Sequence, residues 1–509
     1  MKSLLLLSVY RIKKNLDRKL TMGNRLLIIK KIILMSSIVC TGFGANTFAQ
    51  APTPVGLVPN ERQVEWYNRE IIAFFHFGIN TFEDDVNEGD GKASPAIFNP
   101  TELDCNQWIR VLKSAGIPSG ILVAKHADGF CNWPSKYTDY SVKNSPWKDG
   151  KGDVVKEFME ACKTAGIKAG VYLGPHDRHE KTYGTPAYAD YYANQLSELL
   201  RNYGAIWEMW WDGAGADFLT SDFYTRWADT VRTLQPDCVI FGTKNSSAFA
   251  DCRWVGNESG IAGDPCWSTI NLSSIRDESL HINELNHGEV DGTAYVPAES
   301  DVSIRPSWFY HSSEDEQVKS VETLCDIYCN SVGHNSVLLL NFGPERRGLI
   351  NAIDSANAAR LKSLIDDTFK TNLASGSVIT ALHPRGEGYN PSYLVDNRGN
   401  TYYASADEFK TDTLIFNLGS EKIFDLLMLQ EVIELGHRTT GWSVDYSPDG
   451  SNWKPIPEAT GKQSIGYKWI VRFKPVTASQ IRLSITSGKA CTAIHSFGIY
   501  KQPETVNSN

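Results

Sequence analysis

Short apolar runs alternate with amphipathic segments between about residues 70 and 370. The segments between most of these runs place apolar residues at i, i+3, i+4 and i+7, which predicts helices. A strand followed by a helix, repeated eight times, is typical of a closed parallel (β/α)8 barrel. The predicted strands are 71–77, 121–124, 169–173, 206–211, 239–242, 254–255, 308–310 and 337–340.

Capping residues mark the ends of the first two predicted helices. Thr101 is expected to cap the first helix, and Gly116 lies just past its end. Asp153 and Gly166 bracket the second, because Asp accepts from free first-turn amides and Gly adopts the left-handed backbone that ends a helix. The polar stretch 268–304 shows neither periodicity and predicts a long, loop-like insertion at the active site.

The pattern changes near residue 371, where helical periodicity ends and short alternating strands begin. The sequence Ser447-Pro448-Asp449-Gly450 predicts a tight turn. We therefore expect a catalytic barrel over 50–370 and an all-β sandwich over 371–503. The predicted sandwich strands are 413–417, 426–429, 442–446, 469–473 and 481–485.

Residues 1–49 have the composition of an export signal. Lys30 and Lys31 precede a short apolar run, and small residues follow up to Ala49. This order of basic, apolar and small residues is typical of a secretory signal peptide. The run is too short and interrupted for a transmembrane segment, and no other stretch has spanning length. The protein is therefore expected to be exported, to the periplasm or outside the cell.

Charge and cysteine content argue against some classes of partner and site. The formal net charge of -9 argues against a nucleic-acid partner. Nine of the ten cysteines follow the signal segment, and an odd number cannot all pair within one chain. They are scattered and include no Cys-x-x-Cys pair, so buried free thiols are expected rather than a zinc site or a disulfide framework.

Two carboxylates follow strands of the predicted barrel, at the end where such barrels hold their catalytic residues. Asp212 follows the fourth strand, and alternation places Glu208 and Trp210 on the same face as Asp212. Glu258 follows the sixth strand. Two carboxylates facing across a barrel mouth suit glycoside hydrolysis, in which one attacks the anomeric carbon and the other protonates the leaving oxygen. Alternatively, Asp212 caps the next turn and Glu258 pairs with Arg253.

Other polar and aromatic side chains could bind a ligand. His76 and His126 end neighbouring strands and could join a carboxylate at a metal, but the other strand ends are rich in Trp and Tyr. Neutral imidazoles donating to hydroxyls are therefore favoured, and no metal or cofactor is expected. Trp210 and Trp308 offer apolar walls for a deoxysugar, or belong to the barrel core. The acids that compete with Glu258 lie in the insertion: Glu284, Glu289 and Glu299.

The strand-end segments occur together, in this order, in one enzyme family. They are FFHFGINTF (74–82), AKHADGFCNWPSKYTDYSV (124–142), VYLGPHDRH (171–179), WEMWWDGAG (207–215), RWVGNE (253–258) and LLLNFGPERRGLI (338–350). The combination resembles glycoside hydrolase family 29, the retaining α-L-fucosidases, over nearly the whole barrel. The resemblance implies that Asp212 is the nucleophile, that Glu258 is the acid/base residue, and that fucosylated oligosaccharides or glycans are the substrates.

The resemblance also implies a substrate-binding set and a linkage. The RWVGNE segment is similar to the branch of the family that removes α-1,3 and α-1,4 linked fucose from branched glycans by double displacement. Ala127 stands where the other branch has a second histidine, and 83–89 lacks the Trp that often makes an aglycone contact. The resemblance implies sugar contacts from His76, His126, Tyr172 and Trp210, and Arg253 and Trp308 at the strand ends complete the candidate substrate-binding set.

The C-terminal region is similar to discoidin-like, galactose-binding-like jelly rolls. The similarity rests on NLASG at 372–376, SPDGSNW at 447–453 and the IRLSI strand. Two alternatives to a fucosidase are a sugar-binding barrel without turnover and a barrel glycosidase for another sugar. The two carboxylates argue against the first, and the match in several segments argues against the second. The oligomeric state is left open.

Overall fold

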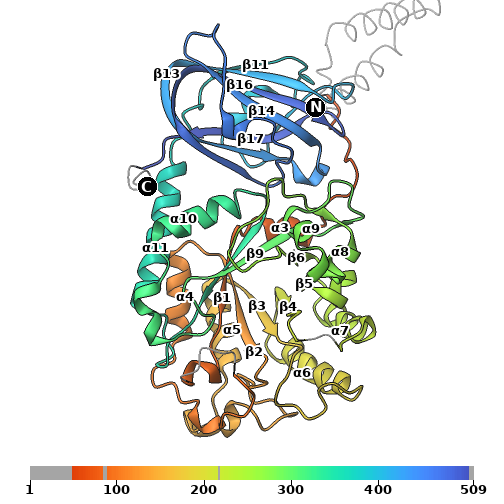
Figure 1. The fold of residues 1–509 in the computed structure, drawn as a ribbon, viewed down its shortest axis with the longest axis vertical. Helices are drawn as coiled ribbons and strands as arrows, with labels where there is room; N and C mark the ends of the chain where they lie inside the picture. Colours follow the sequence, from red (N-terminus) through yellow and green to blue (C-terminus); the bar gives the residue numbers. More distant parts are fainter. Residues whose placement is uncertain (1–48, 84–88, 216–217, 504–509) are drawn as a thin grey trace, which may run out of the picture. The chain divides into compact units, whose positions relative to one another are not determined.

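The computed structural model describes residues 49–83, 89–215 and 218–503, so the predicted signal segment lies outside it except for residue 49. Eight parallel strands close into a barrel in the order β1-β10-β9-β6-β5-β4-β3-β2 (Figure 1). This arrangement confirms the predicted (β/α)8 fold. The barrel strands are β1 (Ile71–Phe75), β2 (Ser119–Lys125), β3 (Lys168–Leu173), β4 (Glu208–Trp210), β5 (Val239–Gly242), β6 (Cys252–Trp254), β9 (Ala298–Ser303) and β10 (Val337–Phe342).

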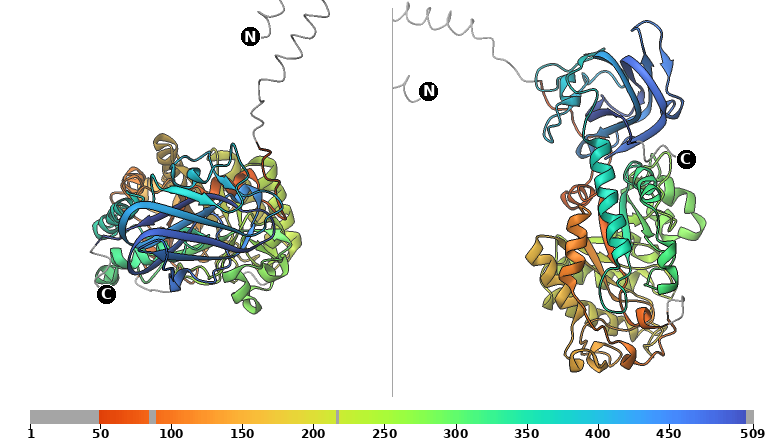
Figure 2. Two further views of the ribbon diagram at one scale, coloured as in Figure 1. Left: turned by 90° about the horizontal axis from the view of Figure 1, so that it is seen from above. Right: turned by 90° about the vertical axis from the view of Figure 1, so that its left-hand side faces the viewer.

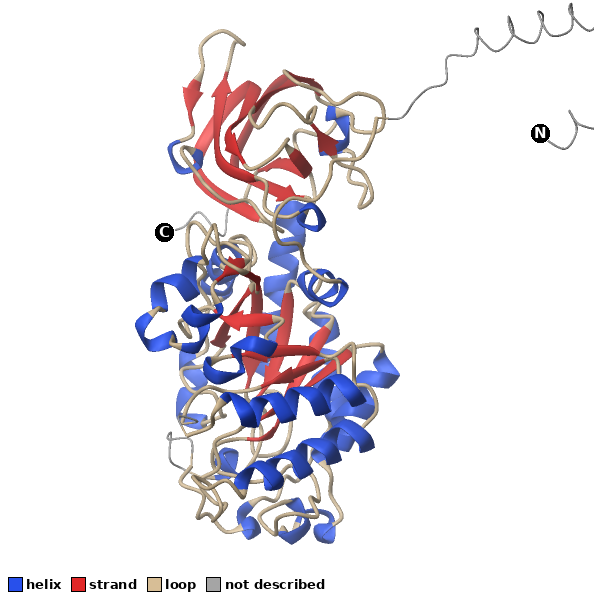
Figure 3. Ribbon diagram, turned by 90° about the vertical axis from the view of Figure 1, so that its right-hand side faces the viewer, coloured by secondary structure: helices blue, strands red, loops and turns tan. Residues whose placement is uncertain are grey.

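Helices cover the outside of the barrel, as the blue ribbons around the red strands in Figure 3 show. The last of them packs against α10 on one side and α4 on the other, and it runs along the barrel wall in Figure 2. The helices are α3 (Glu61–Tyr67), α4 (Cys105–Ser114), α5 (Val154–Ala165), α6 (Tyr188–Asn202), α7 (Ser221–Leu234), α8 (Leu272–Arg276), α9 (Ile282–His287), α10 (Val321–Asn330) and α11 (Ala352–Phe369).

Both predicted ends of the second helix are confirmed, and the predicted start of the first helix is wrong. Asp153 caps α5 by accepting from the Lys156 amide at 2.8 Å, and Gly166 ends the helix with φ of 72°. The cap of α4 is Asp104 rather than Thr101. The preceding chain is held outside the helix, because the Glu102 amide donates to the carbonyl of Arg347 at 2.8 Å.

The seventh barrel strand is β9, and the prediction of a strand at 308–310 is wrong. The six residues of β9 are all buried, yet their sequence is Ala-Glu-Ser-Asp-Val-Ser. Glu299 and Asp301 point into the barrel, while Ser300 bonds to Ser336 at 2.8 Å on the other face. The hydrophobic pattern therefore did not predict this strand. Because β9 begins at Ala298, the insertion ends there rather than at residue 304. The insertion itself contains α8, α9 and a hairpin of β7 (Thr269–Ile270) and β8 (Ala294–Tyr295).

The C-terminal domain is an antiparallel sheet structure, as predicted, with strand order β12-β17-β13-β16-β14-β15 and β11 paired to β13. Two pairs of predicted strands are each one continuous strand, because β-bulges interrupt the pairing of β13 with β16 without ending either strand. Asp449 shapes the predicted turn by accepting from the amides of Ser451 and Asn452 at 2.8 Å. The strands are β11 (Val378–Ala381), β12 (Tyr403–Ala404), β13 (Asp412–Glu431), β14 (Thr439–Ser447), β15 (Lys454–Pro455), β16 (Trp469–Gly488) and β17 (Ala493–Tyr500).

The nine cysteines within the described residues are all buried free thiols, as predicted. Cys325 and Cys329 lie one turn apart on the buried face of α10. Among the described helices, none combines the length and the apolar character needed to cross a bilayer.

Candidate active site

A small cavity of about 160 Å³ lies at the carboxyl ends of the barrel strands. Catalytic residues of parallel barrels lie at this end. Five of the six predicted substrate-binding residues line the cavity, together with both predicted catalytic carboxylates. The lining residues are Phe74, His76, His126, Tyr172, Trp210, Asp212, Gly213, Ala214, Phe241, Thr243, Trp254, Glu258, Glu278, Asp301 and Trp308.

Asp212 is held by two donors just beyond the end of β4. The Tyr172 hydroxyl donates to Oδ2 at 2.9 Å, and the Ala214 amide donates to Oδ1 at 2.8 Å. The amide bond is the turn cap that the sequence left as an alternative, and the tyrosine bond comes from the cavity wall. One carboxylate therefore makes both contacts: Oδ1 caps the turn, and Oδ2 accepts from the tyrosine in the cavity wall. Hydrogen bonds to both oxygens favour the ionised form.

Glu258 follows β6 and lines the same cavity, on an exposed bend. Its predicted alternative partner, Arg253, is fully buried and donates to the backbone carbonyls of Leu285, Trp267 and Val296. The guanidinium therefore holds the insertion against β6. Arg253 precedes Trp254, and alternation along the strand sends Trp254 into the cavity and Arg253 away from it. Arg253 therefore does not line this cavity.

The acids that compete with Glu258 in the sequence do not line the cavity. Glu284 lies 3.5 Å from His281, and Glu289 accepts from Asn271 and Ser274 inside the insertion. Glu299 is fully buried inside the barrel.

Two other acids, Asp301 and Glu278, do line the cavity and were missed by sequence reasoning. Asp301 accepts from Trp254 Nε1 at 2.9 Å. Burial, and then the neighbouring Glu258 carboxylate, raise the pKa of Asp301 well above its usual range. Recognising β9 as a strand would have revealed Asp301, because alternation places it on the cavity face.

The two histidines are neutral hydrogen-bonding groups. Asn341 donates through Nδ2 to Ser303 Oγ and to the Trp308 carbonyl, so its Oδ1 accepts from His76 Nδ1 at 2.7 Å. Burial lowers the pKa of His76 well below its usual value. Burial, Arg178 and His176 lower the pKa of His126 to about 3.

A buried ion pair formed by the preceding residue, Lys125, positions His126. Lys125, the last residue of β2, points outward and pairs with Asp177 at 2.8 Å, and it also donates to Gln195 at 3.0 Å. Both charged side chains are at most 1% exposed. Because side chains alternate, this anchor turns His126 into the barrel, where its Nδ1 has no partner among the described residues.

Aromatic rings form most of the remaining wall. Tyr172 stacks between His126 and Trp210, with ring centroids 5.6 and 5.4 Å away. Trp210 stacks in turn on Phe241 at 3.9 Å. Trp308 lies beyond β9 rather than on a strand, and its ring is 5.2 Å from that of His76. Such a wall offers flat apolar faces to the C–H groups of a sugar ring.

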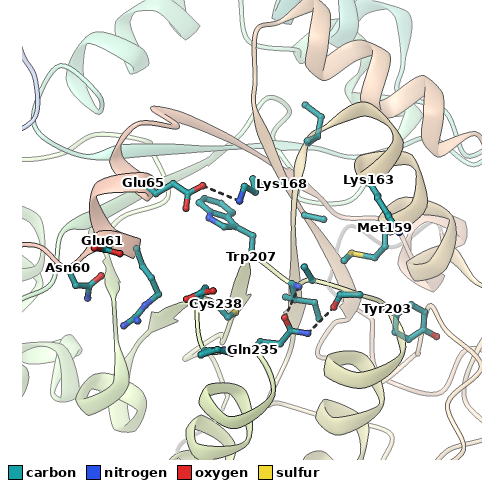
Figure 4. Close-up of a pocket in the computed structure, with 18 residues that line it drawn as sticks. Asn60, Glu61, Glu65, Met159, Lys163, Lys168, Tyr203, Trp207, Gln235 and Cys238 are labelled. Carbon is teal, nitrogen blue, oxygen red and sulfur yellow. Dashed lines mark hydrogen bonds and ion pairs between the residues drawn. The ribbon is translucent and has the colours of Figure 1, made fainter. Parts of the chain in front are cut away.

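A larger cavity of about 1010 Å³ opens at the opposite end of the barrel, near the starts of β3 and β4 (Figure 4). Several of its polar groups are already paired. Glu65 and Lys168 pair at 3.2 Å, and Gln235 Nε2 donates to the carbonyls of Leu200 and Gly204 at 2.9 Å. Catalytic groups lie at the carboxyl end of a parallel barrel, so the smaller cavity is the candidate active site.

A closed parallel barrel with carboxylates and aromatic rings around a cavity at its strand ends has the architecture of a barrel glycoside hydrolase. The alpha-L-fucosidase family model matches residues 55–364, and the F5/8 type C domain model matches residues 378–497. The chain therefore belongs to the α-L-fucosidases of glycoside hydrolase family 29, with a discoidin-like C-terminal domain. It is a glycoside hydrolase whose substrates are fucosylated glycans.

Known relatives match most of this chain. Alpha-L-fucosidase 1 of Arabidopsis thaliana is 38% identical over 457 residues, which are 88% of each protein. A crystal structure from Bacteroides thetaiotaomicron, of proposed α-L-fucosidase activity, is 64% identical with a TM-score of 0.88, over 89% of this chain and 99% of that one. A Ruminococcus gnavus family 29 fucosidase in complex with fucose is 32% identical with a TM-score of 0.82, over 90% and 98%.

The depressed pKa of His126 predicts how its removal affects activity. His126→Asn should lower kcat/KM about 10- to 100-fold, as expected for about 1 to 3 kcal/mol lost with a buried hydrogen bond to substrate. Both limbs of the pH profile should stay in place, because an imidazole with a pKa of about 3 does not titrate in the working range. Steady-state kinetics between pH 4 and 9 test this, and a displaced acidic limb would contradict it.

The same shift has a stability consequence. The folded pKa of His126 lies below the unfolded value of about 6.5, so stability is lost as pH falls from about 6.5 toward 3. The His126→Asn variant should lose less stability over this interval than the wild type, by up to about 1.4 kcal/mol per pH unit.

Proposed function

We propose that this enzyme is a retaining exo-α-L-fucosidase in which Asp212 is the nucleophile and Glu258 is the acid/base residue. One observation carries the proposal. The Tyr172 and Ala214 donors hold Asp212 as an oriented carboxylate, and Glu258 lines the same small cavity. A retaining mechanism needs one ionised and one protonated carboxyl around the anomeric carbon.

The reaction then proceeds in two displacements. Asp212 attacks the anomeric carbon of fucose while Glu258 donates its proton to the glycosidic oxygen, which leaves with the glycan. Glu258, now a carboxylate, removes a proton from water. The water attacks the same carbon, releases fucose from Asp212 and restores both carboxyls to their starting states. His76 and His126 are proposed to bond sugar hydroxyls, and Trp210 and Trp308 to contact the apolar face and methyl group.

The RWVGNE segment supports a preference for α-1,3 and α-1,4 linked fucose. Trp254 and Glu258, both from this segment, line the cavity at the side reached by β6. Residues 84–88, part of the stretch that lacks the Trp of the family branch, lie outside the described residues. Export to the periplasm or the cell exterior, inferred from residues 1–49, remains part of the proposal and suits an enzyme that acts on glycans.

The nucleophile assignment predicts the effect of removing one carboxylate. Asp212→Ala should lower kcat by on the order of 10³-fold or more, because the covalent route is lost. Wild-type enzyme quenched during turnover should carry a fucosyl group on the peptide containing Asp212, detected by mass spectrometry. Asp222→Ala, an exposed residue in the first turn of α7, is the matched control and should keep wild-type kcat. Near wild-type turnover by the Asp212 variant would contradict the assignment.

The acid/base assignment predicts a dependence on the leaving group. Glu258→Gln should slow the hydrolysis of natural glycosides strongly, yet affect aryl fucosides with acidic phenols least, since these leave without a proton. The alkaline limb of the kcat/KM profile should flatten in the variant. Equal losses for poor and activated leaving groups would move the acid role elsewhere, and Asp301→Asn would then be the next variant to measure.

The linkage preference predicts a ranking of substrates. A branched Lewis-type trisaccharide should have a higher kcat/KM than the matching fucosyl disaccharide and an α-1,2 fucoside. The reason is that contacts to the second branch help to position the reacting bond in the transition state. Parallel assays of fucose release from the three glycans measure this. Equal kcat/KM values would mean that the enzyme recognises fucose with relaxed aglycone specificity.

A further inference from the structure

Two glutamates face each other inside the barrel, one layer deeper than the active-site cavity. Glu208 begins β4, and Glu299 is the second residue of β9. Each precedes by two positions a residue that lines the cavity, Trp210 or Asp301, so both carboxyls point into the barrel interior. Both side chains are fully buried, and an oxygen of each lies within 4.8 Å of the other and of Cys252 Sγ.

The surroundings of this pair contain no compensating cation. Within the parts of the chain that the structure describes, neither glutamate forms an ion pair, and neighbouring interior residues such as Trp66, Val239 and Val337 are apolar or aromatic. Two negative charges without a partner in such an interior would be very costly. The pair must therefore hold a proton or bind a cation.

The other titratable groups around the pair are acids and a thiol. They are Asp251, which directly precedes β6, Cys252 on β6 and Asp301 on β9. Asp251 is already neutralised, because Arg62 and Arg232 pair with it at 3.0 and 2.6 Å. Those two cations serve Asp251 and do not compensate the glutamates.

Hydrogen bonds define what each carboxyl oxygen does. Glu299 Oε1 accepts from Trp210 Nε1 at 2.8 Å, and Glu208 Oε1 accepts a long contact from the Cys252 thiol at 3.9 Å. The remaining oxygen of each carboxyl is buried and has no donor in the described structure. Ionised carboxylates only accept hydrogen bonds, so these two oxygens can bond to each other only through a proton.

We propose that Glu208 and Glu299 share one proton, and that this proton makes the pair a positioning device for Trp210. The shared proton fixes Glu299, whose Oε1 then holds the indole of Trp210 in the cavity wall. Trp210 stacks on Tyr172, and Tyr172 donates to Asp212, so the pair also supports the proposed nucleophile. The consequence for fucose binding rests on the proposed function, whereas the shared proton itself does not.

Burial supports this arrangement. It raises the pKa of Glu299 to about 7, and burial together with the charge of Glu299 raises that of Glu208 well above its usual value. Folded pKa values above the unfolded ones mean that the pair stabilises the fold fully below about pH 4.3. This stability is lost as pH rises: Glu299 ionises through about 7, and the two carboxylates repel each other once Glu208, whose pKa the Glu299 charge raises, loses the shared proton at higher pH.

The test replaces the proton by an amide. In Glu299→Gln, the amide oxygen can accept from Trp210 and the amide nitrogen can donate to Glu208, so the variant mimics the protonated pair at every pH. Glu299→Leu removes both interactions. Fucose is the binding probe, and its dissociation constant is measured by calorimetry on the full-length enzyme at pH 6 and pH 9, alongside the thermal midpoint from pH 5 to 9.

The pH dependence of the fucose dissociation constant should distinguish the wild type, Glu299→Gln and Glu299→Leu. The wild-type dissociation constant for fucose should rise about tenfold from pH 6 to pH 9, and that of Glu299→Gln should change less than about twofold. Glu299→Leu should bind fucose about tenfold more weakly at both pH values, as expected for one lost buried hydrogen bond. Glu322→Gln on α10, outside the barrel interior, is the matched control and should follow the wild type.

The thermal midpoint tests the proton independently of any fucosidase property. The midpoint of the wild type should fall more steeply with rising pH than that of Glu299→Gln. Parallel curves for the two proteins would overturn the shared proton. So would one equivalent of bound metal in the wild type that Glu299→Gln lacks, because the cation would then replace the proton. Should Glu299→Gln not fold, Glu208→Gln supplies the same amide from the opposite side and has the same expected results.

Discussion

Closure of the parallel sheet is the constraint on which the site depends. β1 pairs with β10 on one side and with β2 on the other, in registers that match Ala73 to Leu340 and to Gly120. Because all eight strands run in the same direction, closure gathers their carboxyl ends around one opening. His76, near the start of the chain, and Trp308 thereby become neighbours in one wall. Without the β1–β10 pairing, His76 and Trp308 would lie near opposite edges of an open sheet.

A closed barrel is buried on both faces, and this one places acids on the inner face. Helices cover the outer face with an apolar layer, while Glu208, Glu299 and Asp301 project inward among aromatic rings. A polar group there cannot rely on water, so each must find a partner or stay neutral. The two positions differ accordingly: Asp212, at the opening, has two donors, whereas burial and the Glu258 charge raise the pKa of Asp301 well above its usual range.

The sequence predicted the barrel and most of the cavity because seven strands carry recognisable apolar runs and strand ends are easy to locate. β9 escaped because its pattern of acids and small residues has no apolar run to detect, and its burial depends on strands distant in sequence. Arg253 was included among the substrate-binding candidates because it lies in a motif. A motif specifies which residues are adjacent in sequence, but it does not say which face of the strand each side chain occupies. The sequence also did not show that β13 and β16 each continue through a β-bulge, because the pairing with partner strands is what shows that a strand is continuous.

The nine buried thiols bear on how quickly the chain must fold. Disulfide exchange requires a thiolate that another sulfur can reach, and burial denies this access in the native state. An unfolded chain gives no such protection, and in an oxidising compartment its cysteines would pair at random within seconds to hours. A fold that ends with every described cysteine reduced must therefore bury them before oxidation, or rely on catalysts that undo wrong pairs. Wherever this enzyme folds among oxidants, the rate at which it buries its thiols therefore bears on how much of it reaches the native state.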